Sequence, residues 1–160
     1  MTTNELRLRW SRPDQVLALG FGTGLAPVAP GTCGTLVAVP LYWLLKSLHP
    51  GLYLAAVVLG IVIGIYVCAR INRELEREDH PAIVWDEIVG YWVAMIGTPL
   101  SLPVVVAGFV LFRLFDIWKP WPIRWLERRV GGGLGIMLDD LLAGVFAAVV
   151  LHLGLNFFSP

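Results

Sequence analysis

Two long segments without charged residues constrain the fold of this chain more than any other feature. Leu52–Cys68 and Leu141–Phe158 are almost entirely apolar. A helix that crosses the hydrocarbon core of a bilayer needs about 20 mostly apolar residues, with a range of roughly 17–25. Over the whole chain 57% of residues are hydrophobic, and a small soluble domain has too little interior to bury that much apolar surface. The sequence therefore predicts an integral membrane protein, with a soluble α-helical domain as the alternative.

A third apolar segment, Ile88–Phe112, has two interpretations. It is either one long, tilted span or a hairpin that turns at Gly97–Pro103, where two prolines and a glycine interrupt the run. Residues of this kind mark turns, and proline in mid-helix removes a backbone hydrogen bond. Basic clusters flank the segment at Arg70–Arg77 and Arg113–Arg129. Only a hairpin places both clusters on the cytoplasmic side, as the positive-inside rule requires, so we favour the hairpin.

The N-terminal region ahead of the apolar segment Cys33–Leu45 is rich in glycine and proline. Gly20–Gly34 reads GFGTGLAPVAPGTCG and cannot form a regular transmembrane helix, so we expect a re-entrant or interfacial loop whose backbone is satisfied by protein or water. Residues 1–14 are polar and lack the apolar core of a signal peptide, which predicts a cytoplasmic tail. The expected fold is all-α, a single domain over residues 1–160 that forms a small polytopic helical bundle.

Five carboxylates beside the apolar runs are the candidates for chemistry. They lie in the motifs IVWDEIVG, FRLFDIWKPWP and GIMLDDLLAG, and they are Asp86, Glu87, Asp116, Asp139 and Asp140. An ionised carboxylate in apolar surroundings is costly unless it is paired, metal-bound or hydrated. The hairpin topology puts all five at cytoplasmic helix ends, where they can converge. Clustered carboxylates repel one another, and a hard divalent cation such as Mg²⁺, Mn²⁺ or Ca²⁺ relieves that repulsion.

These acids provide a predicted metal site and a predicted catalytic set. The metal ligands are expected among Asp86, Glu87, Asp139 and Asp140, and the catalytic residues among Asp86, Asp116 and Asp140. The alternative is that the acids pair with nearby basic residues or solvate helix ends. Two adjacent acidic pairs and a fifth acid, all beside apolar helices, favour the metal site.

Basic residues near Asp116 are candidate phosphate contacts. Arg113 lies one helical turn earlier, on about the same face, and Lys119 and Arg124 follow. Arginine suits bidentate contact with phosphate, and lysine suits a point-charge contact. The alternative is that they are ordinary positive-inside residues.

The glycine-rich segment adds two candidate phosphate contacts. Thr32 and Thr35 place hydroxyl groups beside glycines whose backbone N–H groups can face an anion. Tight packing of small residues against neighbouring helices explains the same segment equally well.

Other functional classes find little support in the sequence. The net charge is zero, which gives no reason to expect a nucleic-acid partner, and the GFGTG motif lacks the preceding strand of a dinucleotide fold. No G-x-S-x-G motif is present. Cys33 and Cys68 are expected to be packing residues, and His80 and His152 have no metal-ligand partner at a suitable spacing.

Four segments, in this order and spacing, resemble the phosphatidylglycerophosphatase A family: GFGTGLAPVAPGTCGTL, IVWDEIVGYW, GFVLFRLFDIWKPWPIRW and GGLGIMLDDLLAG. The resemblance implies a multi-pass enzyme of the bacterial inner membrane whose active site faces the cytoplasm. It implies Mg²⁺-dependent hydrolysis of the terminal phosphomonoester of phosphatidylglycerophosphate, which leaves phosphatidylglycerol. It also implies that all five acids are functional. The identity of the headgroup follows from the resemblance alone.

The expected mechanism is metal-assisted attack of water, with Asp116 as a candidate general base. An aspartyl-phosphate intermediate is the other route. A divalent-cation transporter or channel subunit is the main competing function, because intramembrane carboxylates often mark ion paths, and a non-catalytic assembly subunit is a third. The expected partners are the phospholipid substrate and membrane lipids, and the sequence does not indicate an oligomer.

Overall fold

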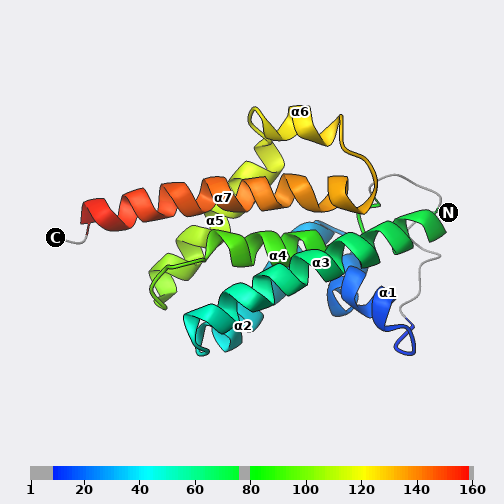
Figure 1. Ribbon diagram of the computed structural model, residues 1–160, viewed down its shortest axis with the longest axis horizontal. Coiled ribbons are helices and arrows are strands. Elements are labelled where there is room, and N and C mark those ends of the chain that lie inside the picture. Colours follow the sequence, from blue (N-terminus) through cyan, green and yellow to red (C-terminus); the bar gives the residue numbers. More distant parts are fainter. Residues whose placement is uncertain (1–8, 76–79, 159–160) are drawn as a thin grey trace.

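A computed structural model describes residues 9–75 and 80–158 of the chain (Figure 1). These residues form eight helical elements and no strand, which confirms the all-α prediction. In chain order the elements are α1 (Pro13–Ala18), the 3₁₀ helix η2 (Gly20–Leu25), α2 (Pro30–Lys46), α3 (Pro50–Glu74), α4 (Trp85–Ala94), α5 (Leu102–Trp118), α6 (Ile123–Glu127) and α7 (Gly132–Phe158). Arg77 and most of the expected N-terminal tail lie outside the described residues.

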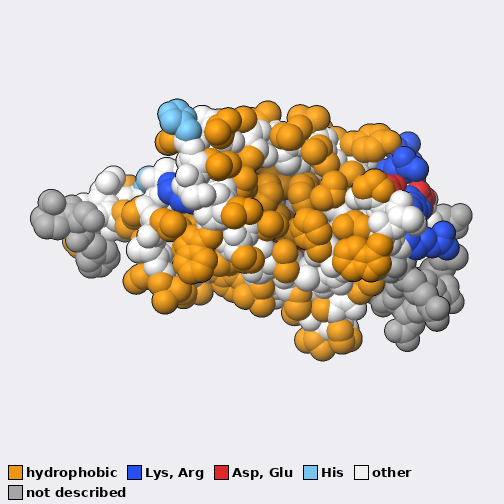
Figure 2. Space-filling view, turned by 90° about the horizontal axis from the view of Figure 1, so that it is seen from below, with side chains coloured by type: hydrophobic (Ala, Val, Ile, Leu, Met, Phe, Trp, Pro, Cys, Tyr) orange, Lys and Arg blue, Asp and Glu red, His pale blue; other side chains and the backbone are white. Residues whose placement is uncertain are grey.

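Two of these helices, α3 and α7, are long and apolar enough to cross a membrane. They contain the two uncharged segments from which such helices were predicted. Only 33% of the most apolar part of α3 and 44% of that of α7 are buried within the protein, whereas the core helix of a soluble protein is mostly buried. Figure 2 shows hydrophobic side chains over most of one face, with the visible acidic groups gathered at one end. Such an apolar surface suits contact with lipid.

The apolar segment Ile88–Phe112 is broken into two helices, as the hairpin interpretation predicts. α4 ends at Ala94, and Gly97 has a φ of +74° in the connection to α5. A Cβ on Gly90 would lie 2.8 Å from both the Asp140 carbonyl oxygen and the Phe112 ring. Gly90 of α4 and Phe112 of α5 therefore lie together near Asp140 of α7. The α5 helix thus runs back towards the end of the bundle where α4 begins. The α4 arm has 10 residues, fewer than the 17 of the α5 arm.

The glycine-rich segment Gly20–Gly34 is irregular only in part. Phe21 and Gly22 have positive φ inside η2, and Ala29 has a φ of 48°. The prediction of an irregular loop is wrong for residues 30–34, which form the first turns of α2. A proline at the first helical position is preorganised for the helix, and Pro30 occupies that position. The absence of a side chain on Gly34 lets α2 approach Val84 closely, because a Cβ on this residue would lie 2.7 Å from the Val84 Cβ.

The short helix α4 forms the centre of the bundle. Nine of its ten residues are buried, and the exception is Glu87. Helices α2, α3, α5 and α7 all contact it. The indole of Trp92 donates to the Ala38 carbonyl at 3.3 Å, and the Tyr53 hydroxyl donates to the Trp92 carbonyl at 2.6 Å. These bonds satisfy aromatic polar groups in the core and hold α4 against α2 and α3.

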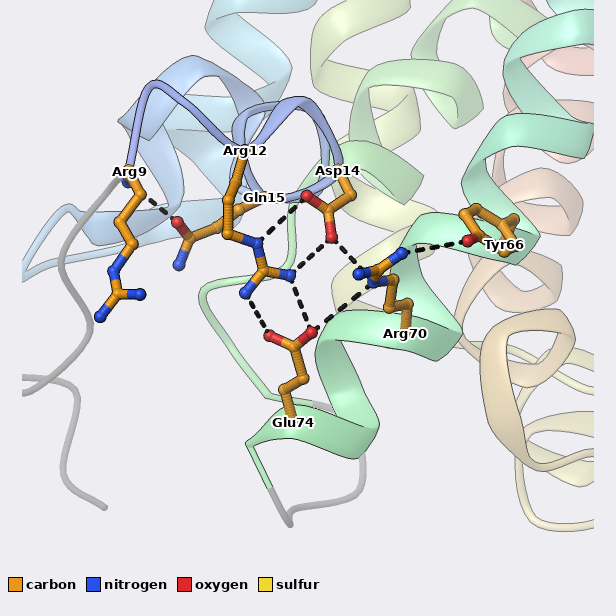
Figure 3. A network of polar contacts seen from close by, with 7 residues as sticks. All are labelled: Arg9, Arg12, Asp14, Gln15, Tyr66, Arg70 and Glu74. Carbon is orange, nitrogen blue, oxygen red and sulfur yellow. Dashed lines mark hydrogen bonds and ion pairs between the residues drawn. The ribbon is translucent and has the colours of Figure 1, made fainter.

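A network of ion pairs joins α1 to the end of α3 (Figure 3). Arg12 contacts Asp14 at 2.6 Å and Glu74 at 2.7 Å, and Arg70 contacts Asp14 at 3.0 Å. The hydrogen bond from Arg12 lowers the pKa of the Asp14 carboxyl group below its usual value. Arg12 and Arg70, the latter from the basic cluster Arg70–Arg77, are thus neutralised by acids within the protein.

Candidate active site

Three of the five predicted acids meet inside the bundle. Asp86 and Glu87 lie in the first turn of α4, and Asp140 faces them from α7. Each offers a carboxylate oxygen, and these oxygens lie within 4.8 Å of one another. Asp86 is 7% exposed and Asp140 is 3% exposed. We call Asp86, Glu87 and Asp140 the acid triad.

The acid triad contains carboxylate oxygens that the described residues leave unsatisfied. Oε2 of Glu87 and Oδ1 of Asp140 are both buried, and neither accepts a hydrogen bond from any described residue. Burying like charges without compensation is strongly unfavourable. Hard oxygen donors of this kind are what Mg²⁺ prefers, so the triad fits the predicted divalent cation.

Close packing of α4 and α7 brings the triad together. A Cβ on Gly144 of α7 would overlap the Gly90 carbonyl oxygen of α4, so only a small residue permits this approach. The N-terminal end of α4 is fixed in turn by Trp85, whose indole donates to the Gly60 carbonyl at 3.0 Å. An acidic first turn also interacts favourably with the helix dipole.

The α5 helix places Arg113 and Asp116 beside the acid triad. Arg113 Nη1 lies 2.5 Å from Asp116 Oδ2, and both side chains are mostly buried, at 15% and 14% exposed. The Asp116 side chain reaches Asp140. Arg113 is therefore the basic candidate that the fold brings to the acid triad.

The start of α2 forms another wall of this site. A Cβ on Gly31 would overlap Oε1 of Glu87 and would lie 3.2 Å from Arg113 Nη1. At this helix start Thr32 and Thr35 were predicted from the sequence as contacts, and Gly31 was not. The Pro30-Gly31 pair is the sequence feature that could have indicated Gly31, because a glycine at a helix start allows a close neighbour to approach the helix end.

Asp139 lies outside the triad, although it is next to Asp140 in the sequence. Its Oδ2 contacts Lys119 Nζ at 2.5 Å, and Glu127 contacts the same ammonium at 2.7 Å. Burial by itself would lower the pKa of Lys119, but the two carboxylates raise it above its ordinary value. Lys119 thus joins the end of α5 to α6 and α7.

The other predicted phosphate contacts occupy different settings. The Thr35 hydroxyl is buried and donates to the Gly31 carbonyl at 2.9 Å, while Thr32 is half-buried in the first turn of α2. Arg124 is exposed on α6 and donates to the Trp118 carbonyl at 3.0 Å. The two threonines therefore lie on the helix end that faces the triad, whereas Arg124 belongs to the α6 region.

Comparison with known proteins gives a consistent result. The family model described as phosphatidylglycerophosphatase A matches residues 16–155. A phosphatidylglycerophosphatase A from Escherichia coli K12 is 48% identical over 147 residues, which cover 91% of this chain and 86% of the relative. One from Haemophilus influenzae is 41% identical over 141 residues, covering 87% and 86%. A protein of Bacteroides thetaiotaomicron with the provisional name phosphatidylinositol-3-phosphatase is 38% identical, covering 85% and 89%. No solved structure matches significantly.

Proposed function

The chain belongs to the phosphatidylglycerophosphatase A family, and we propose that it releases phosphate from phosphatidylglycerophosphate at the acid triad with Mg²⁺. The products are phosphatidylglycerol and inorganic phosphate. The observation that carries the proposal is the meeting of Asp86, Glu87 and Asp140, where buried oxygens of Glu87 and Asp140 accept no hydrogen bond from a described residue. Family membership favours this hydrolase over the transporter alternative.

The proposed setting is the bacterial inner membrane, with the triad near the cytoplasmic surface. The two apolar helices α3 and α7 would span the bilayer, and the α4–α5 hairpin would enter it from the cytoplasmic side. Arg113, Lys119 and the α6 arginines lie towards the end of α7 that carries Asp140, which agrees with the positive-inside rule. The irregular η2 segment would lie at the interface on this side.

The residues of the site have distinct proposed roles. Asp86, Glu87 and Asp140 would hold Mg²⁺, which when bound neutralises phosphate charge and activates water. Arg113 would bind the phosphate, because its Nε is buried and donates to no described residue. The ion pair with Asp116 orients the Arg113 guanidinium for this contact. The start of α2, with Gly31 and Thr32, offers backbone N–H groups to the same anion.

Hydrolysis then requires a proton acceptor near the attacking water. The water oxygen bonds to phosphorus, the phosphorus–oxygen bond to the glycerol breaks, and the leaving oxygen takes up a proton. Asp116 is the proposed acceptor and carrier of that proton, since it lies beside Asp140 and outside the triad. Attack by one of the aspartates on phosphorus is the alternative, and a phosphoenzyme trapped by acid quench would establish it.

The test is phosphate release from phosphatidylglycerophosphate by the purified protein in detergent, with Mg²⁺ or with chelator. We expect Mg²⁺-dependent release by the parent and a loss of at least about a hundredfold in Glu87→Gln and in Asp140→Asn. Asp14→Asn is the matched control, since Asp14 lies in the α1 ion-pair network. Circular dichroism and gel filtration would check folding. Release that persists in both triad variants would refute the site, whereas no release by the parent with any divalent metal would refute the function.

A further inference from the structure

The chain segment that connects α5 to α7 and contains α6 forms an aromatic and basic pocket that the proposed reaction does not use. Its volume is about 650 Å³. The side chains that matter are Trp118, Trp121, Trp125, Arg124, Arg128 and Arg129, and we call this set the α6 pocket.

The tryptophans of the α6 pocket are unusually exposed. Trp121 is 81% exposed, Trp118 is 63% exposed and Trp125 is 46% exposed. An exposed cluster of large apolar side chains marks an interaction surface. Indole rings concentrate where hydrocarbon meets the polar headgroups of a bilayer, because one edge of the ring is apolar and the N–H is polar.

The arginines of the α6 pocket are not neutralised by acids in the described part of the chain. Arg128 and Arg129 are exposed, and neither forms an ion pair there. The Arg129 guanidinium stacks 4.3 Å above the Trp125 ring, a cation–π contact that leaves its edge donors available. Arg12 and Arg70, by contrast, are held by Asp14 and Glu74. Uncompensated positive charge is thus present in the α6 pocket.

In the membrane orientation proposed above, on which this inference rests, the α6 pocket would lie at the level of the headgroups. α6 packs against α7 (Figure 1), and Lys119 ties this region to Asp139, close to the start of the α7 span. Trp121 and Trp118 can therefore contact the bilayer while the guanidinium groups reach the phosphate layer.

We propose that the α6 pocket binds the headgroup of an anionic phospholipid from the surrounding leaflet. The tryptophans fix the depth of α6 in the interface, and Arg128 and Arg129 contact the lipid phosphate, for which guanidinium groups are well suited. The bound lipid is a component of the membrane and not the molecule being hydrolysed. It holds α6 against the membrane beside the cytoplasmic end of α7.

The test measures lipid binding without turnover. Native mass spectrometry of the detergent-purified chain would compare binding of phosphatidylserine and phosphatidylcholine with identical acyl chains. Each arginine near an anionic surface contributes about fivefold in affinity. We expect the parent to bind phosphatidylserine more tightly than phosphatidylcholine. In the double variant Arg128→Gln/Arg129→Gln the ratio of the two affinities should fall at least about tenfold. Trp121→Ala should weaken binding of both lipids.

A matched control removes a positive charge elsewhere at the same end of the protein. Arg73→Gln, in the last turn of α3, should keep the preference for phosphatidylserine. An equal loss in Arg73→Gln, or no preference in the parent, would overturn the proposal. So would a raised KM of the double variant for phosphatidylglycerophosphate in detergent free of other anionic lipid, because the pocket would then be a substrate site. The lipid-binding outcomes do not depend on whether the chain is a phosphatase, whereas the KM comparison does.

Discussion

Gly31 at the start of α2 lies directly against the carboxylate of Glu87 at the start of α4. The contact is so close that a Cβ at residue 31 would overlap Oε1 of Glu87. Two segments more than fifty residues apart in the chain thus define one wall of the acid triad, and the absence of a side chain on one sets the position of the carboxylate on the other.

We therefore expect Gly31→Ala to displace Glu87 and to lower activity strongly. A misplacement of about 1 Å near a reacting centre can cost on the order of a hundredfold in rate, and we predict a loss of that size in kcat/KM for phosphatidylglycerophosphate. Gly51→Ala is a closely matched control. Gly51 also follows a proline at a helix start, but a Cβ there would lie 3.4 Å from the His49 ring. Equal activity of both variants would contradict the packing described for Gly31.

Replacement of Arg113 by lysine should impair phosphate binding even though the charge is kept. A planar guanidinium can contact Asp116 and a phosphate oxygen with separate donors, and an ammonium group cannot reproduce that geometry. We expect kcat/KM to fall by about ten- to a hundredfold, measured at saturating Mg²⁺. Arg73→Lys on α3 serves as the control, since Arg73 is exposed and lies outside the site. Parent-like kinetics for Arg113→Lys would exclude Arg113 as the phosphate ligand.

Mg²⁺ should stabilise the folded protein if it binds the triad. A ligand that binds only the folded state at a hundred times its Kd adds about 2.7 kcal/mol to the free energy of unfolding. Thermal unfolding in detergent should therefore shift upward with Mg²⁺ and return to the starting value with chelator. Glu87→Gln should show a much smaller shift, whereas Asp14→Asn should respond as the parent does. An undiminished shift in Glu87→Gln would place the metal elsewhere.

The Lys119→Met substitution should lower stability, because it leaves the mostly buried Asp139 carboxylate without its ammonium partner. Removing one member of a buried ion pair costs about 3–5 kcal/mol, so we expect a clear drop in the thermal midpoint. The double variant Lys119→Met/Asp139→Asn should recover part of that loss. If the single variant were as stable as the parent, Lys119 would not join α5 to α7.

The contribution of the Lys119–Asp139 ion pair to stability has a predictable pH dependence. The pKa of Lys119 is raised in the folded protein, so its contribution to stability is fully present below the unfolded pKa of about 10.4. It is lost only as the pH rises through the higher folded value. The difference in thermal midpoint between the parent and Lys119→Met should therefore not decline between pH 7 and pH 9 on account of the lysine. A marked decline within that range would show that Lys119 is not held by the two carboxylates.

The sequence was sufficient for the helical class, for the two long apolar helices and for the break in Ile88–Phe112. Each depends on local signals, namely uninterrupted apolar runs and the residues Gly97, Pro99 and Pro103. Local signals did not predict that α4 is only ten residues long and buried on nearly all sides. Its length and burial follow from the helices that surround it. The same is true of residues 30–34, where Pro30 starts a helix inside an apparently irregular stretch.

For the site, the residue types and motifs in the sequence were enough to select five acids and to predict a divalent cation. Which acids meet was decided only by the tertiary structure. Adjacent residues on a helix point about 100° apart, so Asp140 faces α4 while Asp139 faces Lys119. Which of the two turns inward depends on how α7 is rotated against α4, and the close contact between Gly90 and Gly144 sets that rotation. A pattern read along one helix contains no information about its rotation relative to another.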